Sequence, residues 1–361
     1  MIKLIILSPY PLNQAPSQRF RFEQYFNCFQ ENKISITHQS FLDSNTWNVF
    51  YKKGFLLHKF WGILKGIFKR FFLIFSIHRY DLVFIHRETC FIGGAFFEFI
   101  YSNLNRNIIF DFDDAIWLRD VSKANDSLGW LKHPEKTSKI ISYSKLIIAG
   151  NAYLAKYAKK YNSNVVIIPT TIDINYHYRK NQKSLKDKII IGWTGSSTTN
   201  RHLKILLSVI HKLKIHYKEK IMFVMISNIP LEDTLGLINF IPWNKQTEID
   251  DLLNFDIGIM PLPDDEWTRG KCGFKGLQYM ALEIPTIMSP VGVNTEIIQD
   301  GENGFLAATE QEWIQKLSLL IESPELREKL GKAARKTIVE KYSVEANKQK
   351  YLDAFNSVLN M

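Results

Sequence analysis

Cysteine is scarce in this sequence. Its 361 residues include only Cys28, Cys90 and Cys272, and no two of them have C-x-x-C spacing. The pattern argues against a zinc site or a disulfide framework and for a reducing compartment. Cys272 has no histidine motif nearby, so we interpret it as a small packing residue and not as a nucleophile. We therefore expect neither a metal nor a cofactor.

Long apolar runs are also missing. The opening residues MIKLIILSPYPL form a short apolar run that ends at a proline, without the long apolar region and cleavage site of a secretory signal. They are typical of a first buried strand. Lysines interrupt the apolar stretch at residues 51–79 every few residues, whereas a membrane span needs about 20 mostly apolar residues. We expect a cytoplasmic protein.

Acidic residues are outnumbered, with 36 Asp and Glu against 46 Lys and Arg and a net charge of +10. Much of the excess is local, because residues 51–79 mix lysines and arginines with aromatic side chains. A helix or helical hairpin on an anionic membrane surface, at the inner face of the plasma membrane, fits this pattern. An ordinary helix packed on its domain, with its lysines in water, fits it too. Nucleic acid is not expected as a partner, because no nucleic-acid motif is recognisable.

Strands alternate with helices along the chain, which predicts an α/β fold with parallel sheets covered on both faces. In the first half we expect strands near 2–8, 34–40, 81–85, 107–111, 145–148 and 164–168, and helices near 17–31, 92–103, 134–143 and 151–161. In the second half we expect strands near 188–193, 221–226, 238–241, 256–260 and 285–289, and helices near 199–217, 246–253 and 273–282.

Length and composition suit two domains. A chain of 361 residues with 46% hydrophobic residues is long for one core and can bury two. A polar, lysine-rich stretch at 175–186 has no apolar periodicity and is the expected linker. We therefore place a first domain at 1–174, a second domain at 187–343 and a final helix at 344–361.

Residues 270–301, GKCGFKGLQYMALEIPTIMSPVGVNTEIIQDG, form the most informative block. Lys271 and Lys275 are four residues apart and share a helical face, and Gln278 lies on the same side. Two glycines precede the helix start, where backbone amides and the helix dipole favour an anion. The block predicts a pyrophosphate site. An amphipathic helix with two solvated lysines is the alternative.

A second candidate for phosphate binding is the turn GWTGSSTTN, residues 192–200. Gly195 and Ser196 belong to a tight strand-to-helix connection whose amides can hold a phosphate. Arg201 follows and would add positive charge. Connections rich in glycine and serine are common, so the place of this turn at the start of the second half is what favours the interpretation.

Polar side chains also follow two strands of the first half, in IHRET at 85–89 and FDFDDAIW at 110–117. Ligands of open α/β sheets bind at the carboxyl ends of the strands, so an aspartate here would orient an acceptor hydroxyl or take its proton. Helix capping for the aspartates and a buried, satisfied imidazole for the histidine are the alternatives. The residues are His86, Arg87, Glu88, Asp111, Asp113 and Asp114.

The block at 270–301 resembles the donor segment K-x-x-E-Y-M-A-x-G-x-P of GT-B glycosyltransferases in the large retaining group called family 4. The matching residues are Lys275, Tyr279, Met280, Ala281 and Pro285. Gln278 replaces the glutamate that accepts hydrogen bonds from the ribose, Gly270 replaces a glutamate that contacts the sugar, and Glu283 replaces a glycine. Asp264, Asp265 or Glu266 in the same loop would be a substitute carboxylate.

Three more segments resemble the family, in the family's order. They are the S-x-R-x-R element with Ser17, Arg19 and Arg21, IIPTTIDI at 167–174, and IGWTGSSTTNRHL at 191–203. The resemblance implies a GT-B fold, in which two Rossmann-like domains face each other across a cleft and the last helix crosses back to the first domain. It also implies transfer of a sugar from a nucleotide-diphosphate sugar to a glycan or polyprenyl-linked acceptor, with retention and without a metal.

The resemblance assigns roles to the candidates. Lys275, with Lys271 or Arg201, would neutralise the leaving diphosphate, and Gln278 would hold the ribose. The donor-binding candidates are Gly195, Ser196, Arg201, Lys271, Lys275, Gln278, Gly292, Val293, Asn294 and Thr295. The catalytic candidates are His86, Asp113, Asp114 and Lys275, and the acceptor-side candidates are Arg19, Arg21, Arg87, Glu88 and Asp111. A nucleotide-sugar epimerase on the same scaffold and a non-catalytic nucleotide-sugar-binding or scaffold protein stay open.

Overall fold

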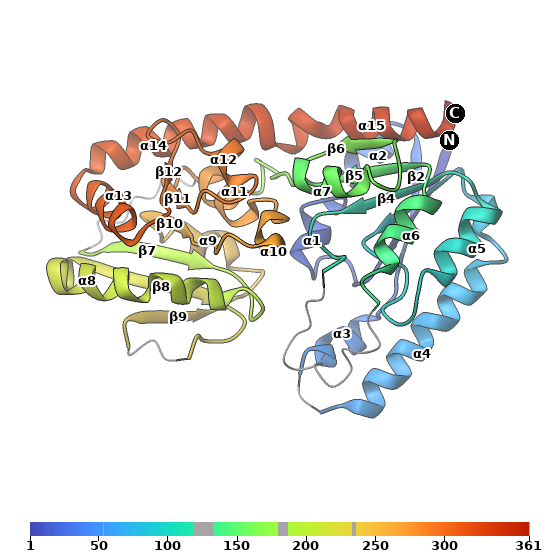
Figure 1. The fold of residues 1–361 in the computed structure, drawn as a ribbon, viewed down its shortest axis with the longest axis horizontal. Coiled ribbons are helices and arrows are strands. Elements are labelled where there is room, and N and C mark those ends of the chain that lie inside the picture. Colours follow the sequence, from blue (N-terminus) through green and yellow to red (C-terminus); the bar gives the residue numbers. More distant parts are fainter. Residues whose placement is uncertain (53, 119–132, 180–186, 233–235, 361) are drawn as a thin grey trace. The chain divides into compact units, whose positions relative to one another are not determined.

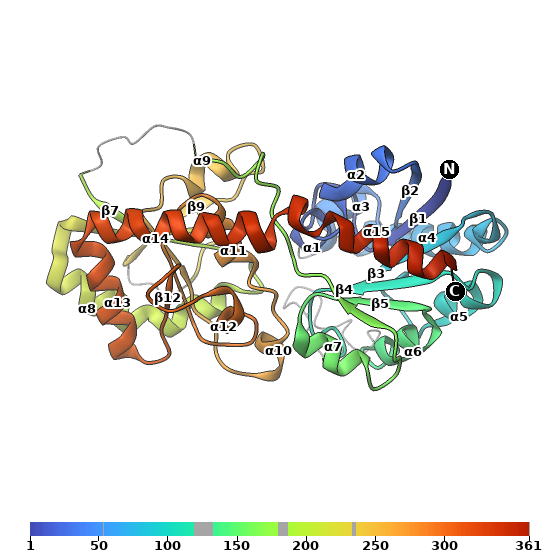
Figure 2. The ribbon, with the colours of Figure 1, turned by 90° about the horizontal axis from the view of Figure 1, so that it is seen from above.

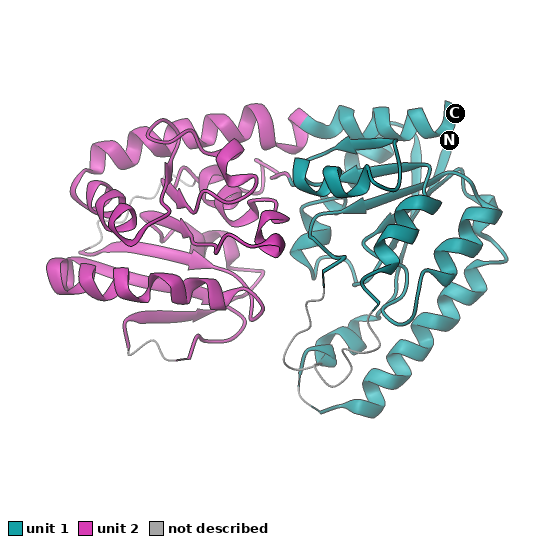
Figure 3. Cartoon of the chain, in the orientation of Figure 1, with its two compact units in different colours: residues 1–170, 347–361 teal, residues 171–346 magenta. Residues whose placement is uncertain are grey.

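The computed structural model describes residues 1–52, 54–118, 133–179, 187–232 and 236–360 (Figure 1). The chain divides into two compact units, which Figure 3 colours separately. The first unit holds residues 1–170 together with 347–361, and the second holds residues 171–346. Of the expected linker at 175–186, residues 180–186 lie outside the described part of the chain.

The first unit is built on a six-stranded parallel sheet with the order β2-β1-β3-β4-β5-β6. Its central strands β3, β4 and β5 are buried along their whole length, as parallel strands covered on both faces must be. The strands are β1 (Ile2–Ser8), β2 (Ile34–Ser40), β3 (Leu82–His86), β4 (Ile108–Phe112), β5 (Leu146–Ala149) and β6 (Val165–Ile167).

The helices of the first unit depart from the expected alternation in two places, one of which is the unexpected helix α3. The predicted continuous helix at 17–31 is wrong, because α1 (Pro16–Arg19) ends before a 3₁₀ turn and α2 (Phe26–Glu31) follows. Phe20, Arg21 and Phe22 are all buried, and three successive residues span about 200° around an α-helix. The remaining helices are α3 (Ser44–Phe50), α4 (Leu56–Leu73), α5 (Phe96–Leu104), α6 (Lys136–Tyr143) and α7 (Ala152–Ala158).

Helix α4 is a single helix of 18 residues, not a hairpin. Its buried face contains two glycines that allow close packing: a Cβ atom on Gly62 would lie 2.2 Å from Thr46, and one on Gly66 would lie 2.8 Å from the ring of Phe41. Helix α5 lies beside α4 in Figures 1 and 2, and the Tyr101 hydroxyl donates to the carbonyl of Arg70 at 2.6 Å. Within the described ranges, no helix is both long enough and apolar enough to cross a bilayer.

The second unit has its own six-stranded parallel sheet, with the order β12-β11-β10-β7-β8-β9. The short edge strand β12 was not expected from the sequence. The strands are β7 (Ile189–Thr194), β8 (Ile221–Ser227), β9 (Ile238–Pro242), β10 (Ile257–Met260), β11 (Thr286–Met288) and β12 (Phe305–Leu306).

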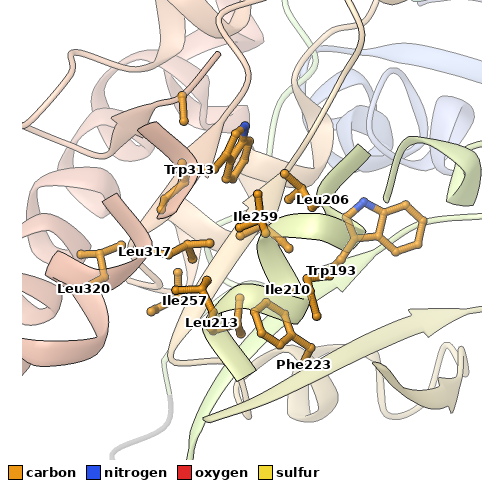
Figure 4. Close-up of a cluster of buried hydrophobic side chains, with 14 of the residues drawn as sticks. Trp193, Leu206, Ile210, Leu213, Phe223, Ile257, Ile259, Trp313, Leu317 and Leu320 are labelled. Atoms are coloured by element: carbon orange, nitrogen blue, oxygen red, sulfur yellow. The ribbon is translucent and has the colours of Figure 1, made fainter. Parts of the chain in front are cut away.

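Helices on this sheet bury a large apolar core, part of which Figure 4 shows. Ile257 and Ile259 of β10 pack there with Leu213 of α8 and Leu317 of α13. Helix α14 runs beside α11, which holds the predicted donor lysine (Figure 2). The helices are α8 (Leu207–Tyr217), preceded by a 3₁₀ segment at Asn200–Leu206, then α9 (Glu248–Leu252), α10 (Glu266–Arg269), α11 (Phe274–Ala281), α12 (Asn294–Ile297), α13 (Glu310–Glu322) and α14 (Pro324–Thr337).

The last helix, α15 (Val344–Asn360), returns to the first unit. The ring of Tyr351 lies 4.5 Å from that of Tyr25, and the ring of Phe355 lies 5.0 Å from that of Phe29. The Tyr351 hydroxyl also donates to the carbonyl of Arg21 at 3.0 Å. These contacts confirm the predicted return of the chain.

Candidate functional site

Three predicted cations of the second unit gather around one histidine that the sequence analysis did not single out. His202 follows Arg201 in the 3₁₀ segment and is 4% exposed. Burial, together with the charges of Lys275, Arg201 and Lys271, lowers the pKa of His202 to about 4. Among the described residues, Nε2 of His202 has no hydrogen-bond partner. Cations that act on one buried imidazole would also attract a phosphorylated ligand.

Helix α11 is held in place by residues that leave little room for substitution. Gly273 precedes it with φ 68°, and a Cβ atom there would lie 2.3 Å from Ile297. Gly276 faces Met288 on β11, where a Cβ atom would lie 1.6 Å from the terminal methyl group. Gly276 lets the helix approach the sheet and Gly273 lets its start approach α12, so the backbone position of Lys275 is fixed by packing.

Each lysine of the predicted pair lies over an aromatic ring. The Nζ atom of Lys275 is 5.4 Å from the ring centre of Trp193, and that of Lys271 is 4.6 Å from the ring centre of Trp267. Cation–π contacts hold an ammonium group in place while leaving its charge undiminished. Trp193 is buried at the end of β7, so the sheet itself orients Lys275.

The backbone amides of the phosphate cradle predicted at Gly195 and Ser196 both have partners within the protein. The amide of Gly195 donates to the carbonyl of Ile226 at 3.0 Å, and the amide of Ser196 donates to Oγ1 of Thr199 at 3.1 Å. The next amide, of Ser197, donates to Oδ1 of Asn228 at 2.7 Å. The turn therefore satisfies its own donors. Gly195 is required for a different reason, because a Cβ atom there would lie 2.2 Å from the indole of Trp193.

The loop from Gly292 to Thr295 also uses part of its predicted phosphate donors internally. The amide of Asn294 donates to Val291 at 3.2 Å, and that of Thr295 donates to Gly292 at 3.4 Å. The Asn294 side chain is fully buried and donates to the carbonyl of Ser289 at 2.9 Å. Asn294 thus shapes the loop, while Thr295 is exposed and Val293 is buried at the start of α12.

Gln278 does not share an exposed face with Lys275. Its side chain is 5% exposed, and Nε2 lies 3.3 Å from Nε2 of the buried His177. The amide assigned to the ribose is therefore engaged inside the second unit. The physical reason is that α11 is covered by α14 on the side that carries Gln278, a tertiary contact that helical spacing does not reveal.

One of the three loop carboxylates lies near the basic group. The charge of Asp265 raises the pKa of His202, whereas the charges of the two lysines and Arg201 lower it. It also caps α10 by accepting from the amide of Thr268 at 2.8 Å. Asp264 is paired with Arg269, at 2.6 Å. Asp265 is therefore the better substitute for the glutamate that Gly270 replaces.

In the first unit, His86, Asp111 and Arg21 form a buried polar group. Nδ1 of His86 lies 2.7 Å from Oδ2 of Asp111, and Arg21 forms an ion pair with the other oxygen of that carboxylate. Burial opposes ionisation of Asp111, but the charge of Arg21 and the hydrogen bond from His86 outweigh it and lower the pKa of the carboxyl. Arg21 and Asp111 lie in the core and pair with each other, and their assignment to the acceptor side stays a prediction.

His86 is buried but only partly satisfied. Its Nδ1 atom faces Asp111, whereas its Nε2 atom has no partner among the described residues. Phe22 packs edge-on against the imidazole, with ring centres 5.4 Å apart. Burial raises the pKa of Glu23, although the charges of Arg19 and His86 act in the opposite direction. The sequence analysis missed Glu23, although it follows the Arg19 and Arg21 element directly.

Asp113 and Asp114 bind an arginine. Nε of Arg87 donates to Asp113 and Nη2 donates to Asp114, both at 2.7 Å. Burial alone would lower the pKa of Arg87, but the two carboxylates raise it. Both aspartates are thus paired with Arg87, and their role in orienting or deprotonating an acceptor hydroxyl stays a prediction. Arg87 folds back because its own backbone has φ 62°, a conformation that the strand pattern does not reveal.

The remaining acceptor-side candidates also have partners. Glu88 is paired with the buried Lys136 of α6 at 2.5 Å, and Lys136 donates to the carbonyl of Cys90. Arg19 lies 5.0 Å from the ring of Phe20. In the part of the chain that the structure describes, no three His, Cys, Asp or Glu side chains gather into a possible metal site.

Residues 176–337 match the family model described as Glycosyl transferases group 1. This region is a group 1 glycosyltransferase domain. No curated protein sequence matches the chain. The matched region contains the basic group around His202, and the glycosyltransferase therefore has its charged site inside the recognised domain.

Solved structures show the fold of the whole chain. Sucrose-phosphate synthase from Thermosynechococcus elongatus superposes with a TM-score of 0.72 at 12% identity, covering 100% of both chains. A glycosyltransferase from Rickettsia africae gives a TM-score of 0.65 at 13% identity, covering 99% of this chain and 98% of that one. HepE from Anabaena, in complex with UDP and glucose, gives 0.64 at 12% identity, covering 99% and 100%. The glycosyltransferase has the GT-B fold.

Proposed function

We propose that the chain transfers a sugar from a nucleotide-diphosphate sugar, with retention and without a metal ion, to a glycan or polyprenyl-linked acceptor. The observation that carries the proposal is the match of residues 176–337 to the group 1 model, a region in which Lys275 lies over Trp193 and Lys271 lies over Trp267. The charges of both lysines and of Arg201 act on the buried His202. The comparison structure of HepE contains UDP and glucose, so a uridine diphosphate sugar is the first donor to test.

The chemistry requires a stabilised leaving group. Cleavage of the glycosidic bond to the diphosphate leaves negative charge on its oxygens, and fixed cations that meet this charge lower the barrier. Lys275 is oriented by Trp193 and Lys271 by Trp267, so both are positioned before the ligand arrives. Three cations supply the charge that a divalent ion supplies in other transferases, which supports a reaction without metal.

On the acceptor side, His86 is the candidate whose second ring nitrogen has no partner among the described residues, although its side chain is fully buried. Asp111 holds its Nδ1 atom, which leaves Nε2 to accept or donate a proton. This arrangement fixes the tautomer and orientation of an imidazole in the manner of a carboxylate-supported general base. Arg87, Asp113 and Asp114 then form a rigid polar support beside it at the ends of β3 and β4.

Helix α4 supports a membrane-associated acceptor. Its buried face includes Lys59 and Arg70, whereas its aromatic side chains point outward, with Trp61 58% exposed and Phe72 65% exposed. An ordinary packed helix would bury its aromatic side chains and expose its lysines and arginines. Within the segment 51–79, the large apolar side chains that are exposed are Tyr51, Phe55, Leu56, Leu57, Phe60, Trp61, Phe68, Phe71, Phe72 and Phe75. We propose that this outward face lies on an anionic membrane surface.

Thermal shift with UDP-, GDP- and other sugar nucleotides, in the presence of EDTA, tests the donor assignment. A ligand that binds only the folded protein raises its melting temperature. One class of nucleotide sugar should do so, and its incubation with a lipid-linked acceptor should release nucleoside diphosphate and give a product of unchanged anomeric configuration by NMR. Conversion of the donor without any acceptor would indicate an epimerase, and binding without turnover would indicate a scaffold protein.

A further inference from the structure

A pocket of about 500 Å³ lies between helix α4 and the β2 edge of the first sheet. Its volume is in the range of small-molecule sites. The pocket is separate from the polar group at the ends of β3 and β4. Its lining residues are Ile5, Thr37, Gln39, Lys65, Phe68, Lys69, Phe72, Leu73, Ser76 and Tyr80.

The charged side chains of the pocket are both lysines. Lys65 and Lys69 are one helical turn apart on α4, so their ammonium groups lie on the same side. Lys65 is 68% exposed and has only a long contact of 3.8 Å with Asp43. Lys69 forms no ion pair with any residue that the structure describes, and burial lowers its pKa. A bound anion would restore the stability of the charged form of Lys69.

The rest of the pocket is largely apolar. Phe68 and Phe72 form a second row one turn apart, and Leu73 and Ile5 are buried at the base. Phe72 is also part of the outward aromatic face of α4 described above. Pocket and face are therefore continuous, so a molecule held by the pocket can extend along an apolar surface.

We infer that this pocket binds one anionic phospholipid, with its phosphate between Lys65 and Lys69 and an acyl chain along Phe68, Phe72 and Leu73. The combination of two cations with an adjoining apolar wall matches a molecule that is charged at one end and apolar along its length. No Asp or Glu occurs in the 18 residues of α4, so the helix itself has no carboxylate that would compete with such a ligand for the two lysines.

This site extends the membrane contact proposed for residues 51–79 from a surface to a specific pocket. Monomeric lipid distinguishes the two, because it reports a pocket without any bilayer. Native mass spectrometry and calorimetry of the full chain with lysophosphatidylglycerol, below the concentration at which that lipid forms micelles, should show one bound molecule. Lysophosphatidylcholine and glycerol phosphate should bind about tenfold more weakly, since one lacks net charge and the other lacks the chain.

Two variants localise the site. Lys69→Glu reverses the charge of a half-buried lysine, and Thr37→Phe fills the pocket from the edge strand without changing charge. Each should weaken lysophosphatidylglycerol binding about tenfold or more. Lys139→Glu, an exposed lysine on α6 of the same unit, is the matched control and should bind like the wild type. Melting curves and nucleotide binding by the second unit confirm that each variant is folded.

The inference is overturned if lysophosphatidylglycerol does not bind, if glycerol phosphate binds as tightly, or if neither pocket variant weakens binding. The donor assignment has a separate readout in nucleotide binding, so failure of one proposal leaves the other testable. If a variant still binds lysophosphatidylglycerol but no longer floats with vesicles, the membrane contact lies outside the pocket. That result would support the pocket as a separate lipid site.

Discussion

The hydroxyl group of Tyr279 on α11 accepts a hydrogen bond of 2.7 Å from the backbone amide of Thr194 at the end of β7. Both groups are buried, and burial raises the pKa of Tyr279, so the hydroxyl stays neutral. The bond joins the helix that carries Lys275 to the strand that carries Trp193. It therefore sets the distance between the two partners of the cation–π contact.

Tyr279→Phe should weaken donor binding without removing any group that touches the donor. The buried amide of Thr194 would lose its acceptor, which costs about 1–3 kcal/mol of folding free energy. Urea denaturation measures that loss, and calorimetry with the nucleotide sugar measures affinity. Tyr217→Phe, an exposed hydroxyl paired with Glu322 in the same unit, is the control. Unchanged stability in Tyr279→Phe would show that the bond does not hold α11.

Lys275→Ala should abolish transfer while leaving the fold intact. Loss of one fixed charge on a leaving group costs on the order of a hundredfold or more in rate. Steady-state kinetics with the identified donor measure this. Lys332→Ala is the matched control, because Lys332 is an exposed lysine of the same unit, 66% exposed and paired with Glu328. Wild-type turnover in Lys275→Ala would refute the leaving-group role.

The free energy of unfolding should fall as pH drops from 6.5 toward 4, partly because of His202. Its pKa is about 4 in the folded protein and 6.5 as a model value, so the unfolded state binds more protons in this window. Stability is then lost on acidification, by up to about 1.4 kcal/mol per pH unit for one histidine. Arg201, Lys271 and Lys275 oppose protonation, and Asp265 favours it.

His202→Gln should flatten this pH dependence, as urea denaturation at several pH values would show. His211→Gln, an exposed histidine on α8, should leave the slope unchanged. A bound diphosphate sugar brings negative charge to the cations and should also reduce the slope. If His202→Gln and the wild type have the same slope, the imidazole is not buried in the folded protein.

Asp111→Asn should destabilise the first unit strongly. It would leave Arg21 buried without a counter-charge, and breaking a buried ion pair costs about 3–5 kcal/mol. The exposed Asp353 on α15, which accepts from Gln349, gives the control Asp353→Asn. Denaturation followed by circular dichroism reports both. A loss below about 1 kcal/mol, as for a surface pair, would contradict the buried arrangement.

Vesicle flotation tests the outward face of α4. Replacing Phe60 and Trp61 by serine should reduce binding to phosphatidylglycerol vesicles by on the order of a hundredfold, because each aromatic side chain contributes about 1.5–3 kcal/mol when fully buried. Phe240 and Trp243, partly exposed in the second unit, provide a matched double control. Equal flotation of the two double variants would remove support for membrane docking through α4.

The strands were predictable because buried parallel strands have a simple sequence pattern. β1 occupies Ile2–Ser8 as expected, since it is a nearly unbroken apolar run that ends where the chain turns. The expected common helical face of Lys271 and Lys275 is wrong, because α11 begins at Phe274 and Lys271 precedes it, while their role in donor binding stays a prediction. The action of Arg201 and these lysines on the same histidine depends on the tertiary fold, which the sequence does not show.

The wrong or missed predictions have a common origin, because the sequence does not show which side chains the tertiary fold brings next to a residue. The sequence shows that Gly195 lacks a side chain, but not that the indole of Trp193 occupies the space. It shows that Asp113 follows a strand, but not that Arg87 turns back to bind it. His202 was missed although it stands next to Arg201, because a single histidine in a polar segment has no periodic signal.

The return of α15 to the first unit reverses the order in which the two units can fold during synthesis. Tyr25 and Phe29, near the start of the chain, are covered by Tyr351 and Phe355. The second unit is one continuous segment, 171–346, and has all its residues as soon as these have been translated. The first unit must wait for residues 347–361, and until then part of its core is open to chaperones.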